Sequence, residues 1–154
     1  MKKFLLFLCL LSFSFNDLFA QKIGKKETIE YILTKLKEVE IGREKSTKVE
    51  INEDGTMTVW TGYINFDHSI TSFHISDVNF KPYRTKETDL FLKVECNSGY
   101  CVDCKEFFPT NELYKKFTFD AHHFRINNPK DIERLIKAFK NLKTYYPIKK
   151  DKFD

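Results

Sequence analysis

Apolar residues follow a helical period at both ends of this chain and a period of two between them. Between Thr28 and Val39 they recur at spacings of three and four, which predicts an amphipathic helix with one buried face. A second helical stripe follows Asn128 and Pro129, residue types that favour the N-cap and the first helical position. We expect this second helix to span about 16 residues and to end before Pro147.

Apolar and polar residues alternate between Lys48 and about Ile126, which predicts a series of short strands. The sequence Asn-Glu-Asp-Gly at 52–55 separates two such runs and predicts a tight hairpin turn. Pro82 lies inside another run and indicates an edge strand or an early strand end. The stretch 106–113 contains turn-forming residues and predicts a loop.

The predicted order is helix, about seven mostly antiparallel strands, helix. Strands that are grouped, and do not alternate with helices, indicate the α+β class. A seven-strand antiparallel barrel or sandwich closed by a C-terminal helix would resemble the pleckstrin-homology-like architecture. That resemblance concerns architecture and implies no function.

The first twenty residues have the features of a secretory signal peptide. A basic start is followed by an apolar run too short to span a bilayer and by a small residue, Ala20. We expect cleavage between Ala20 and Gln21, one domain over 21–146 and a charged flexible tail over 147–154. The protein is then exported to the periplasm or beyond the cell, and it has no transmembrane span.

Composition narrows the class of protein further. Removal of residues 1–20 takes away two lysines and one aspartate, so the net charge falls from +4 to +3, which selects no partner. The remaining chain keeps eleven Phe, seven Tyr and Trp60. Aromatic side chains bury large areas, so a compact core is expected without a metal ion or other cofactor.

Three cysteines follow the predicted cleavage point, and an exported protein favours their oxidation. If Ser98 and Gly99 form a hairpin turn, Cys96 and Cys101 face each other at a distance that permits a disulfide. We expect this pair to be bonded and Cys104 to be a free thiol.

Two alternatives use the same cysteines. Cys101 and Cys104 have the C-x-x-C spacing of redox dithiols, but no helix pattern follows them to lower a thiol pKa. Together with His122 they provide ligand types for zinc. His122 and His123 are neighbours on a predicted strand, so their side chains should point to opposite faces and should not share one metal ion.

Other chemistry has little support in the sequence. No hydrolase, metalloprotease, P-loop or dinucleotide-binding motif occurs, so no catalytic residue is assigned. The predicted last helix carries a basic stripe, which is typical of a solvated face and would also suit an anionic partner; it comprises Lys130, Arg134, Lys137, Lys140 and Lys143. No nucleic-acid-binding motif accompanies the stripe.

Four segments occur in an order that resembles a group of small exported bacterial proteins of unknown function. They are Lys-Glu-Thr-Ile-Glu-Tyr-Ile (26–32), Asn-Glu-Asp-Gly-Thr-Met-Thr-Val (52–59), Leu-Lys-Val-Glu-Cys-Asn-Ser-Gly-Tyr-Cys-Val (92–102) and Asp-Ile-Glu-Arg-Leu-Ile-Lys-Ala-Phe-Lys-Asn-Leu (131–142). The resemblance implies an exported single domain with a cysteine-flanked hairpin and a Lys-Ala-Phe-Lys-x-Leu helix. It implies no activity.

The leading hypothesis is therefore a non-enzymatic module that binds a protein, a peptide or an envelope component through a sheet face, a sheet edge or a barrel mouth. The alternative is a metal-binding or thiol-redox protein that uses Cys101, Cys104 and a histidine. A third hypothesis is a hydrolase assembled from scattered residues, for which a single sequence carries no signature. The partner and the oligomeric state stay open.

Overall fold

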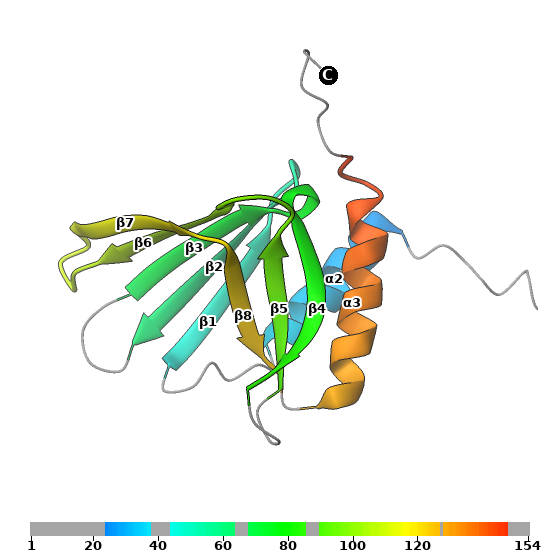
Figure 1. The fold of residues 1–154 in the computed structure, drawn as a ribbon. Helices are drawn as coiled ribbons and strands as arrows, with labels where there is room; N and C mark the ends of the chain where they lie inside the picture. Colours follow the sequence, from blue (N-terminus) through cyan, green and yellow to red (C-terminus); the bar gives the residue numbers. More distant parts are fainter. Residues whose placement is uncertain (1–23, 38–43, 64–67, 86–89, 127, 148–154) are drawn as a thin grey trace, which may run out of the picture.

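The computed structural model describes five segments of the chain, which are 24–37, 44–63, 68–85, 90–126 and 128–147. The predicted signal peptide, its cleavage point at Ala20 and Gln21, and all but the first residue of the predicted tail lie outside these segments. Two α-helices, a short 3-10 helix and eight strands make up the described part (Figure 1). In chain order they are α2 (Lys25–Lys37), β1 (Glu44–Ile51), β2 (Thr56–Tyr63), β3 (His68–His74), η1 (Ile75–Asp77), β4 (Val78–Arg84), β5 (Leu90–Cys96), β6 (Val102–Phe107), β7 (Leu113–Phe119), β8 (Ala121–Arg125) and α3 (Pro129–Lys143).

The strands form two antiparallel sheets. Sheet A has five strands in the order β1-β2-β3-β6-β7, and sheet B has three in the order β4-β5-β8. In the described segments the two sheets do not close into a barrel, so the barrel form of the expected architecture is not observed. The α+β class itself is confirmed.

Both sheets are parts of one bent meander. The chain leaves sheet A after β3 and enters sheet B as β4, returns from β5 to β6, and crosses again from β7 to β8. Strand β5 pairs with β4 and β8, while β6 pairs with β3 and β7. Three long strands therefore bend along one line, at 75–77, 97–100 and Asp120. The sequence predicted about seven strands, and the described segments contain eight.

Backbone hydrogen bonds connect the three bends to one another. The N–H of Asn97 donates to the carbonyl oxygen of Asp77 over 2.8 Å, and the N–H of Cys96 donates to that of Asp120 over 2.8 Å. The N–H of Cys101 donates to the carbonyl oxygen of Phe119 over 3.2 Å. The backbone groups that leave the regular strand ladders at the bends thus find partners in the neighbouring bend.

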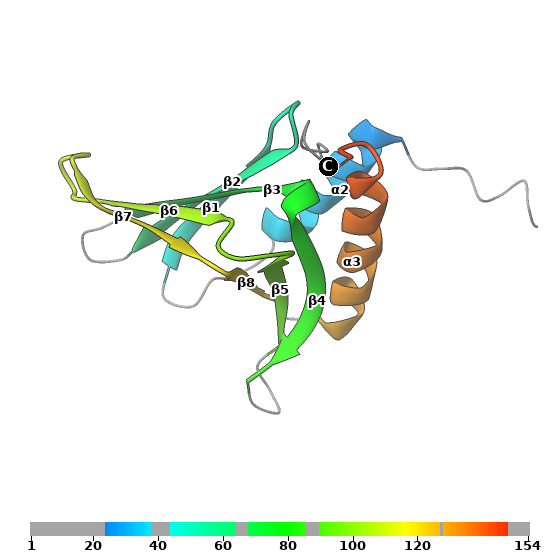
Figure 2. The same cartoon turned by 45° about the horizontal axis from the view of Figure 1, so that its top comes forward.

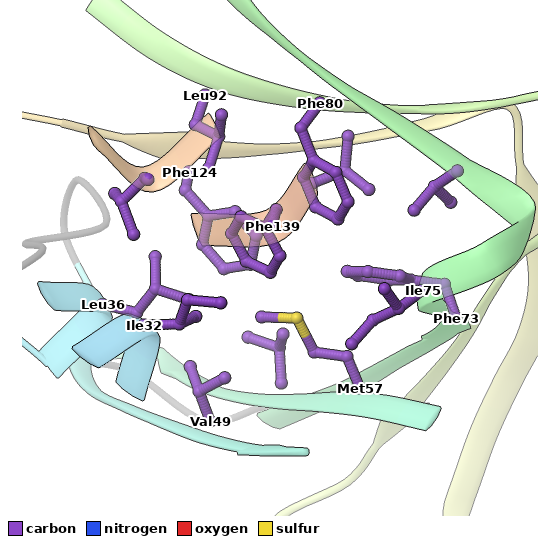
Figure 3. Close-up of a cluster of buried hydrophobic side chains, with 14 of the residues drawn as sticks. Ile32, Leu36, Val49, Met57, Phe73, Ile75, Phe80, Leu92, Phe124 and Phe139 are labelled. Carbon is purple, nitrogen blue, oxygen red and sulfur yellow. The ribbon is translucent and has the colours of Figure 1, made fainter. Parts of the chain in front are cut away.

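The hydrophobic core lies between the two helices and the inner faces of both sheets (Figures 2 and 3). The rings of Phe80 on β4 and Phe139 on α3 are stacked with their centroids 3.9 Å apart. Ile32 and Leu36 of α2 are fully buried in the same cluster, together with Met57 of β2. The helical stripes predicted from the sequence therefore provide the core contacts of both helices.

Local contacts explain where both helices start, and the start of α3 is as predicted. Asn128 caps α3 by accepting a hydrogen bond from the N–H of Lys130, and Pro129 occupies the first turn. Helix α2 begins at Lys25, before the predicted Thr28, because the N–H and the hydroxyl of Thr28 both donate to the carbonyl oxygen of Gly24. The 52–55 turn joins β1 to β2, and Pro82 lies in β4, one of the two edge strands of sheet B.

Candidate functional site

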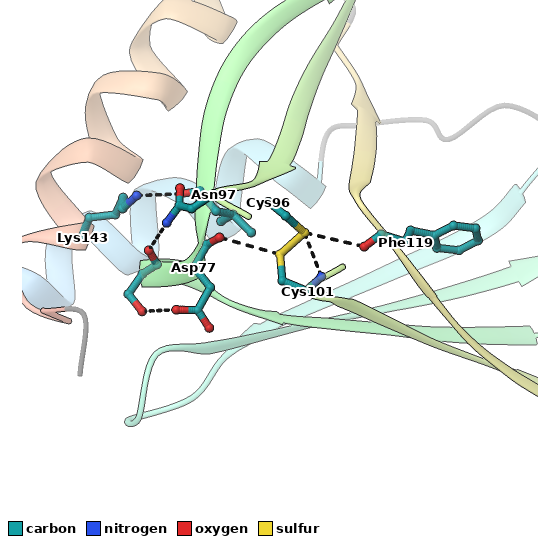
Figure 4. Close-up of a disulfide and its surroundings, with 8 residues drawn as sticks. Asp77, Cys96, Asn97, Cys101, Phe119 and Lys143 are labelled. Atoms are coloured by element: carbon teal, nitrogen blue, oxygen red, sulfur yellow. Dashed lines mark hydrogen bonds between the residues drawn. A yellow bond between two sulfur atoms is a disulfide. The ribbon is translucent and has the colours of Figure 1, made fainter. Parts of the chain in front are cut away.

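The Cys96–Cys101 disulfide is present, but its setting differs from the predicted one (Figure 4). The two Cα atoms are 5.7 Å apart. The segment between the cysteines does not reverse the chain as a hairpin turn would, and it joins β5 of sheet B to β6 of sheet A. Glu95 pairs with Ala121 and Val102 pairs with Phe119, so the predicted hairpin with Ser98 and Gly99 as its turn is wrong.

The hairpin prediction failed because it considered only the residues between the two cysteines. Gly99 adopts a positive φ of 56°, as its turn-like neighbourhood predicts. The flanking residues nevertheless pair with strands that are distant in the sequence. Cys96 Sγ lies 3.6 Å from the carbonyl oxygen of Phe119, and Cys101 Sγ lies 3.7 Å from that of Asp77. Disulfide sulfurs have no hydrogen to donate, so these are contacts in which the bridge rests against both neighbouring bends (Figure 4).

The residues of the alternative metal or redox site have separate roles. Cys101 is bonded to Cys96, and Cys104 is buried on β6, where the hydroxyl of Thr71 donates to its sulfur over 3.7 Å. Burial raises the pKa of the Cys104 thiol. The described segments contain no group of three or more His, Cys, Asp or Glu side chains placed to hold a metal ion. A thiolate at Cys101 would require prior reduction of the disulfide.

The two adjacent histidines face opposite sides of β8, as predicted. His122 packs inward against Phe73 and Phe124 with ring centroids 6.4 and 4.7 Å away. Its Nε2 atom is buried and has no hydrogen-bond partner among the residues that the structure describes. Burial, assisted by the nearby His123, lowers the pKa of His122 to about 4. His123 faces outward beside Tyr83, with their ring centroids 5.2 Å apart.

The other two histidines have local structural contacts. His68 stacks on Phe107 at 4.9 Å between ring centroids. The Nδ1 atom of His74 lies 2.6 Å from the Ser76 hydroxyl, and its Nε2 atom lies 2.6 Å from the carbonyl oxygen of Asp54. His74 therefore links the bend at η1 to the β1–β2 turn.

One lysine of the predicted basic stripe is not part of a solvated face. The Nζ atom of Lys143 donates to the carbonyl oxygen of Val78 over 2.6 Å, at the point where the chain enters sheet B. Burial lowers the pKa of this ammonium group. Lys130, Lys137 and Lys140 are exposed on α3, as expected. Lys143 is thus a structural anchor of the bend, and the hydropathy pattern of α3 did not distinguish it from the others.

Charges on the outer face of sheet B neutralise one another. The carboxylate of Glu95 accepts hydrogen bonds from the ammonium groups of Lys81 and Lys93, the latter over 2.6 Å. These two contacts lower the pKa of Glu95 to about 2. The Lys93 ammonium also lies 5.8 Å from the centroid of the Tyr83 ring. The lysines of this face therefore already have a carboxylate partner.

Residues 102–119 form the β6–β7 hairpin, which extends away from both helices (Figures 1 and 2). Among the described strands, β7 is the last strand of sheet A and pairs with β6 alone. Leu113 and Tyr114 are 55% and 59% exposed, and Phe119 is 43% exposed. No residue of β7 belongs to the hydrophobic core of the described chain. The apolar side chains of β7 are therefore placed at an open sheet edge without contributing to that core.

The lysines of the β6–β7 hairpin differ from those of sheet B. Lys105 on β6 lies directly opposite Lys116 on β7, and neither has an ion-pair partner in the described segments. Lys115 points to the other face, where its ammonium lies 5.4 Å from the centroid of the Phe117 ring. Phe117 in turn contacts Phe119 edge to face at 4.7 Å between centroids. The open edge thus combines exposed aromatic rings with two lysines, Lys105 and Lys116, that form no ion pair in the described segments.

The turn-forming residues of 106–113 predicted a loop over that whole stretch, so the sequence did not indicate this edge. The loop is shorter, because β6 continues to Phe107 and β7 begins at Leu113. The turn residues Pro109 and Asn111 do lie in the connection, and Asn111 has a positive φ of 65°. Strand-favouring Tyr114 and Phe117 were an available signal, although the two intervening lysines interrupt the alternation.

Comparison with known proteins assigns no family. No protein-family model, curated protein or solved structure matches this chain. Neither helix in the described segments has the length and apolar character needed to cross a membrane.

Proposed function

We propose that this chain is an exported, non-enzymatic interaction module that binds an extended segment of a partner protein along the free edge of β7. The observation that carries the proposal is the edge itself, a strand that in the described segments is paired on one side only and carries apolar and basic side chains outside the core. A free edge presents backbone N–H and C=O groups that a further strand satisfies. An extended partner segment would supply those groups and cover the exposed rings.

The charges at the edge favour such a partner over unspecific aggregation. Edge lysines oppose pairing between identical edges, because like charges then come together. They leave pairing with a strand of complementary charge unhindered. Lys115 and Lys116 are consecutive and therefore protect both faces of β7.

We also propose an exported location, periplasmic or extracellular. The predicted signal peptide and the Cys96–Cys101 disulfide both favour an oxidising compartment. The disulfide joins the strands on either side of the bend from which the β6–β7 hairpin extends. Its role in the module is to fix the direction of the hairpin relative to the helices. The resemblance to small exported proteins and to the pleckstrin-homology-like architecture stays a prediction, on which this proposal does not depend.

The thiol-redox and metal alternative has weaker support. It requires Cys101 as a free thiolate, whereas Cys101 is bonded to Cys96. Its two other groups, the buried thiol of Cys104 and the buried Nε2 atom of His122, lie on β6 and β8 of different sheets. We therefore do not propose it as a second function.

Selection from a displayed library of random ten-residue peptides tests the proposed function. The purified protein, with its disulfide intact, is the bait, and enriched peptides are synthesised for hydrogen–deuterium exchange. We expect bound peptides to slow amide exchange in residues 113–119 and to leave α3 unchanged. Enriched peptides that protect another surface, or a failure to enrich any peptide, would overturn the proposal.

N-methylated peptides test the mode of binding. An added strand uses the amides of every second residue to bond to the edge. Two versions of one enriched peptide, methylated on complementary sets of alternate amides, should therefore differ. We expect one set to abolish binding and the other to preserve it. Equal effects of both sets would show that the peptide does not bind as a strand.

A further inference from the structure

The two lysines at the edge complete a row of side chains that crosses the outer face of sheet A. Lys48, Trp60, Ile70, Lys105 and Lys116 are successive register partners on β1, β2, β3, β6 and β7. At the β1 end of the row, the ammonium of Lys48 lies 4.8 Å from the centroid of the Trp60 ring and 2.6 Å from the Glu50 carboxylate. At the β7 end, Lys105 and Lys116 lie opposite each other, and in the described segments neither lies over an aromatic ring or pairs with a carboxylate.

Two like charges directly opposite one another disfavour the pairing of their strands. Lys105 and Lys116 have this arrangement, and the next position in their row is empty because β7 is the edge strand. A strand added to β7 would place one side chain at that position, next to Lys116. Asp103 lies on the same face of β6, two residues before Lys105, but it forms no ion pair with either lysine in the described segments. A carboxylate at the added position would be the first one paired with Lys116.

We infer that the partner segment carries an acidic residue directly opposite Lys116, flanked by apolar residues that cover Phe117 and Phe119. This inference rests on the proposed function and specifies the chemistry of its partner. Side chains alternate between faces along a strand, so the residue next to the acidic one points to the inner face. There it meets Phe117, whose ring and that of Phe119 form one continuous apolar contact.

A second copy of this chain fits the same edge poorly. In an antiparallel pair of two β7 strands centred on Lys116, the two Lys116 side chains face each other, and Lys105 of each copy lies one strand away. Four ammonium groups would then share one row without a carboxylate. The charge arrangement therefore selects an acidic segment of a different protein over self-association.

A charge-swap experiment with defined peptides tests the inference. The probes are two fluorescein-labelled nine-residue peptides of alternating Thr and Val that differ only at one central Thr position, which is Glu in one and Lys in the other. Binding to the intact protein and to Lys116→Glu is measured by fluorescence anisotropy. The matched control is Lys137→Glu, which makes the same charge change on the exposed face of α3.

We expect the native protein to prefer the Glu peptide by at least about fivefold, the scale of a well-placed exposed ion pair. Lys116→Glu should reverse the preference, whereas Lys137→Glu should keep it. Hydrogen exchange with the Glu peptide should show protection of residues 113–119. A native folding transition of each variant, followed by circular dichroism, establishes that the swap has not unfolded the hairpin.

The outcomes separate the inference from the proposed function. Equal affinity of both peptides, with protection of residues 113–119, would overturn the acidic specificity and leave strand addition intact. Absence of protection by either peptide would overturn both. Binding to phosphatidylglycerol vesicles that Lys116→Glu abolishes, without peptide binding, would assign the edge to a lipid surface and would also overturn the inference. A dimer of the native protein in sedimentation, with residues 113–119 protected from exchange in the dimer, would identify a second copy as the occupant and would overturn the inference.

Discussion

The ring of Tyr146 lies directly against the backbone of Gly55. A Cβ atom added to Gly55 would stand 2.7 Å from the Tyr146 Cδ1 atom, and Gly55 has a positive φ of 94°. The Tyr146 hydroxyl also donates to the carbonyl oxygen of Asn52 over 3.2 Å. The β1–β2 turn is thus fixed to the segment that follows α3, and the predicted hairpin turn has a tertiary role.

Gly55→Ala should therefore destabilise the fold by about 1–3 kcal/mol, because it adds backbone strain to a steric clash. Gly99→Ala is the matched control, since Gly99 also has a positive φ but no atom lies within 4 Å of an added Cβ. We expect the control to cost less. Urea unfolding of both variants measures the difference, and equal losses would show that the Tyr146 contact is unimportant.

The disulfide should contribute about 2 kcal/mol to stability, because it closes a short loop and restricts the unfolded chain only modestly. Replacing Cys96 and Cys101 together by Ser should lower the free energy of unfolding by that amount. Cys104→Ala is the control, because it removes a thiol that is not part of the disulfide. It tests whether the loss of unfolding free energy is specific to the disulfide. Thiol titration of the denatured chain without residues 1–20 should give one thiol, from Cys104. Three thiols would contradict the observed bond.

The buried His122 should make stability depend on pH. Its pKa is about 4 in the folded protein and 6.5 when exposed, so the unfolded chain binds its proton more readily. Neutral His122 therefore gives full stability above pH 6.5, and the contribution is lost as the pH falls toward 4. By linkage the loss amounts to about 3 kcal/mol.

Unfolding at several pH values, compared between the native protein and His122→Phe, isolates this effect. In His122→Phe, the free energy of unfolding should no longer fall between pH 6.5 and 4 through this group. His123→Gln should alter that fall less. A decline of the same size in His122→Phe would assign the pH dependence to other groups.

Lys143 should matter for stability far more than its neighbours on α3. Lys143→Ala removes the charged donor to the Val78 carbonyl oxygen, and we expect a loss of about 1–2 kcal/mol. Lys140→Ala changes an exposed side chain in the same turn and should stay within about 0.5 kcal/mol of the native protein. Thermal unfolding compares the two. Equal effects would mean that the bond to Val78 adds no net stability.

Local patterns identified most elements but not the way they are combined. The apolar stripe around Phe139 and the N-cap at Asn128 were sufficient to place α3, because both depend on residues within a few positions of each other. The 97–100 segment shows the opposite case. Its composition is that of a turn, yet backbone bonds from Asn97 and Cys96 to distant residues make it a bend between two sheets.

The candidate site also has one part that the sequence indicated and one part that it did not. The residues of the alternative site, Cys101, Cys104 and His122, were recognised by their chemistry, and the tertiary structure gives them a disulfide and two buried positions. The edge at Lys116 was not recognised, because exposure at a sheet edge depends on which strands pair, and the sequence of one strand does not contain that information.

The sequence by itself determined the α+β class, the two helical stripes, the 52–55 turn and the cysteine pair that bonds. Each of these depends on backbone preferences or side-chain spacing over a short stretch. Only the tertiary structure decided that three strands bend together, that Lys143 anchors the bend, and that β7 is left as an open edge. These properties arise from pairing between distant segments, whose free energy depends on the packing of the whole domain.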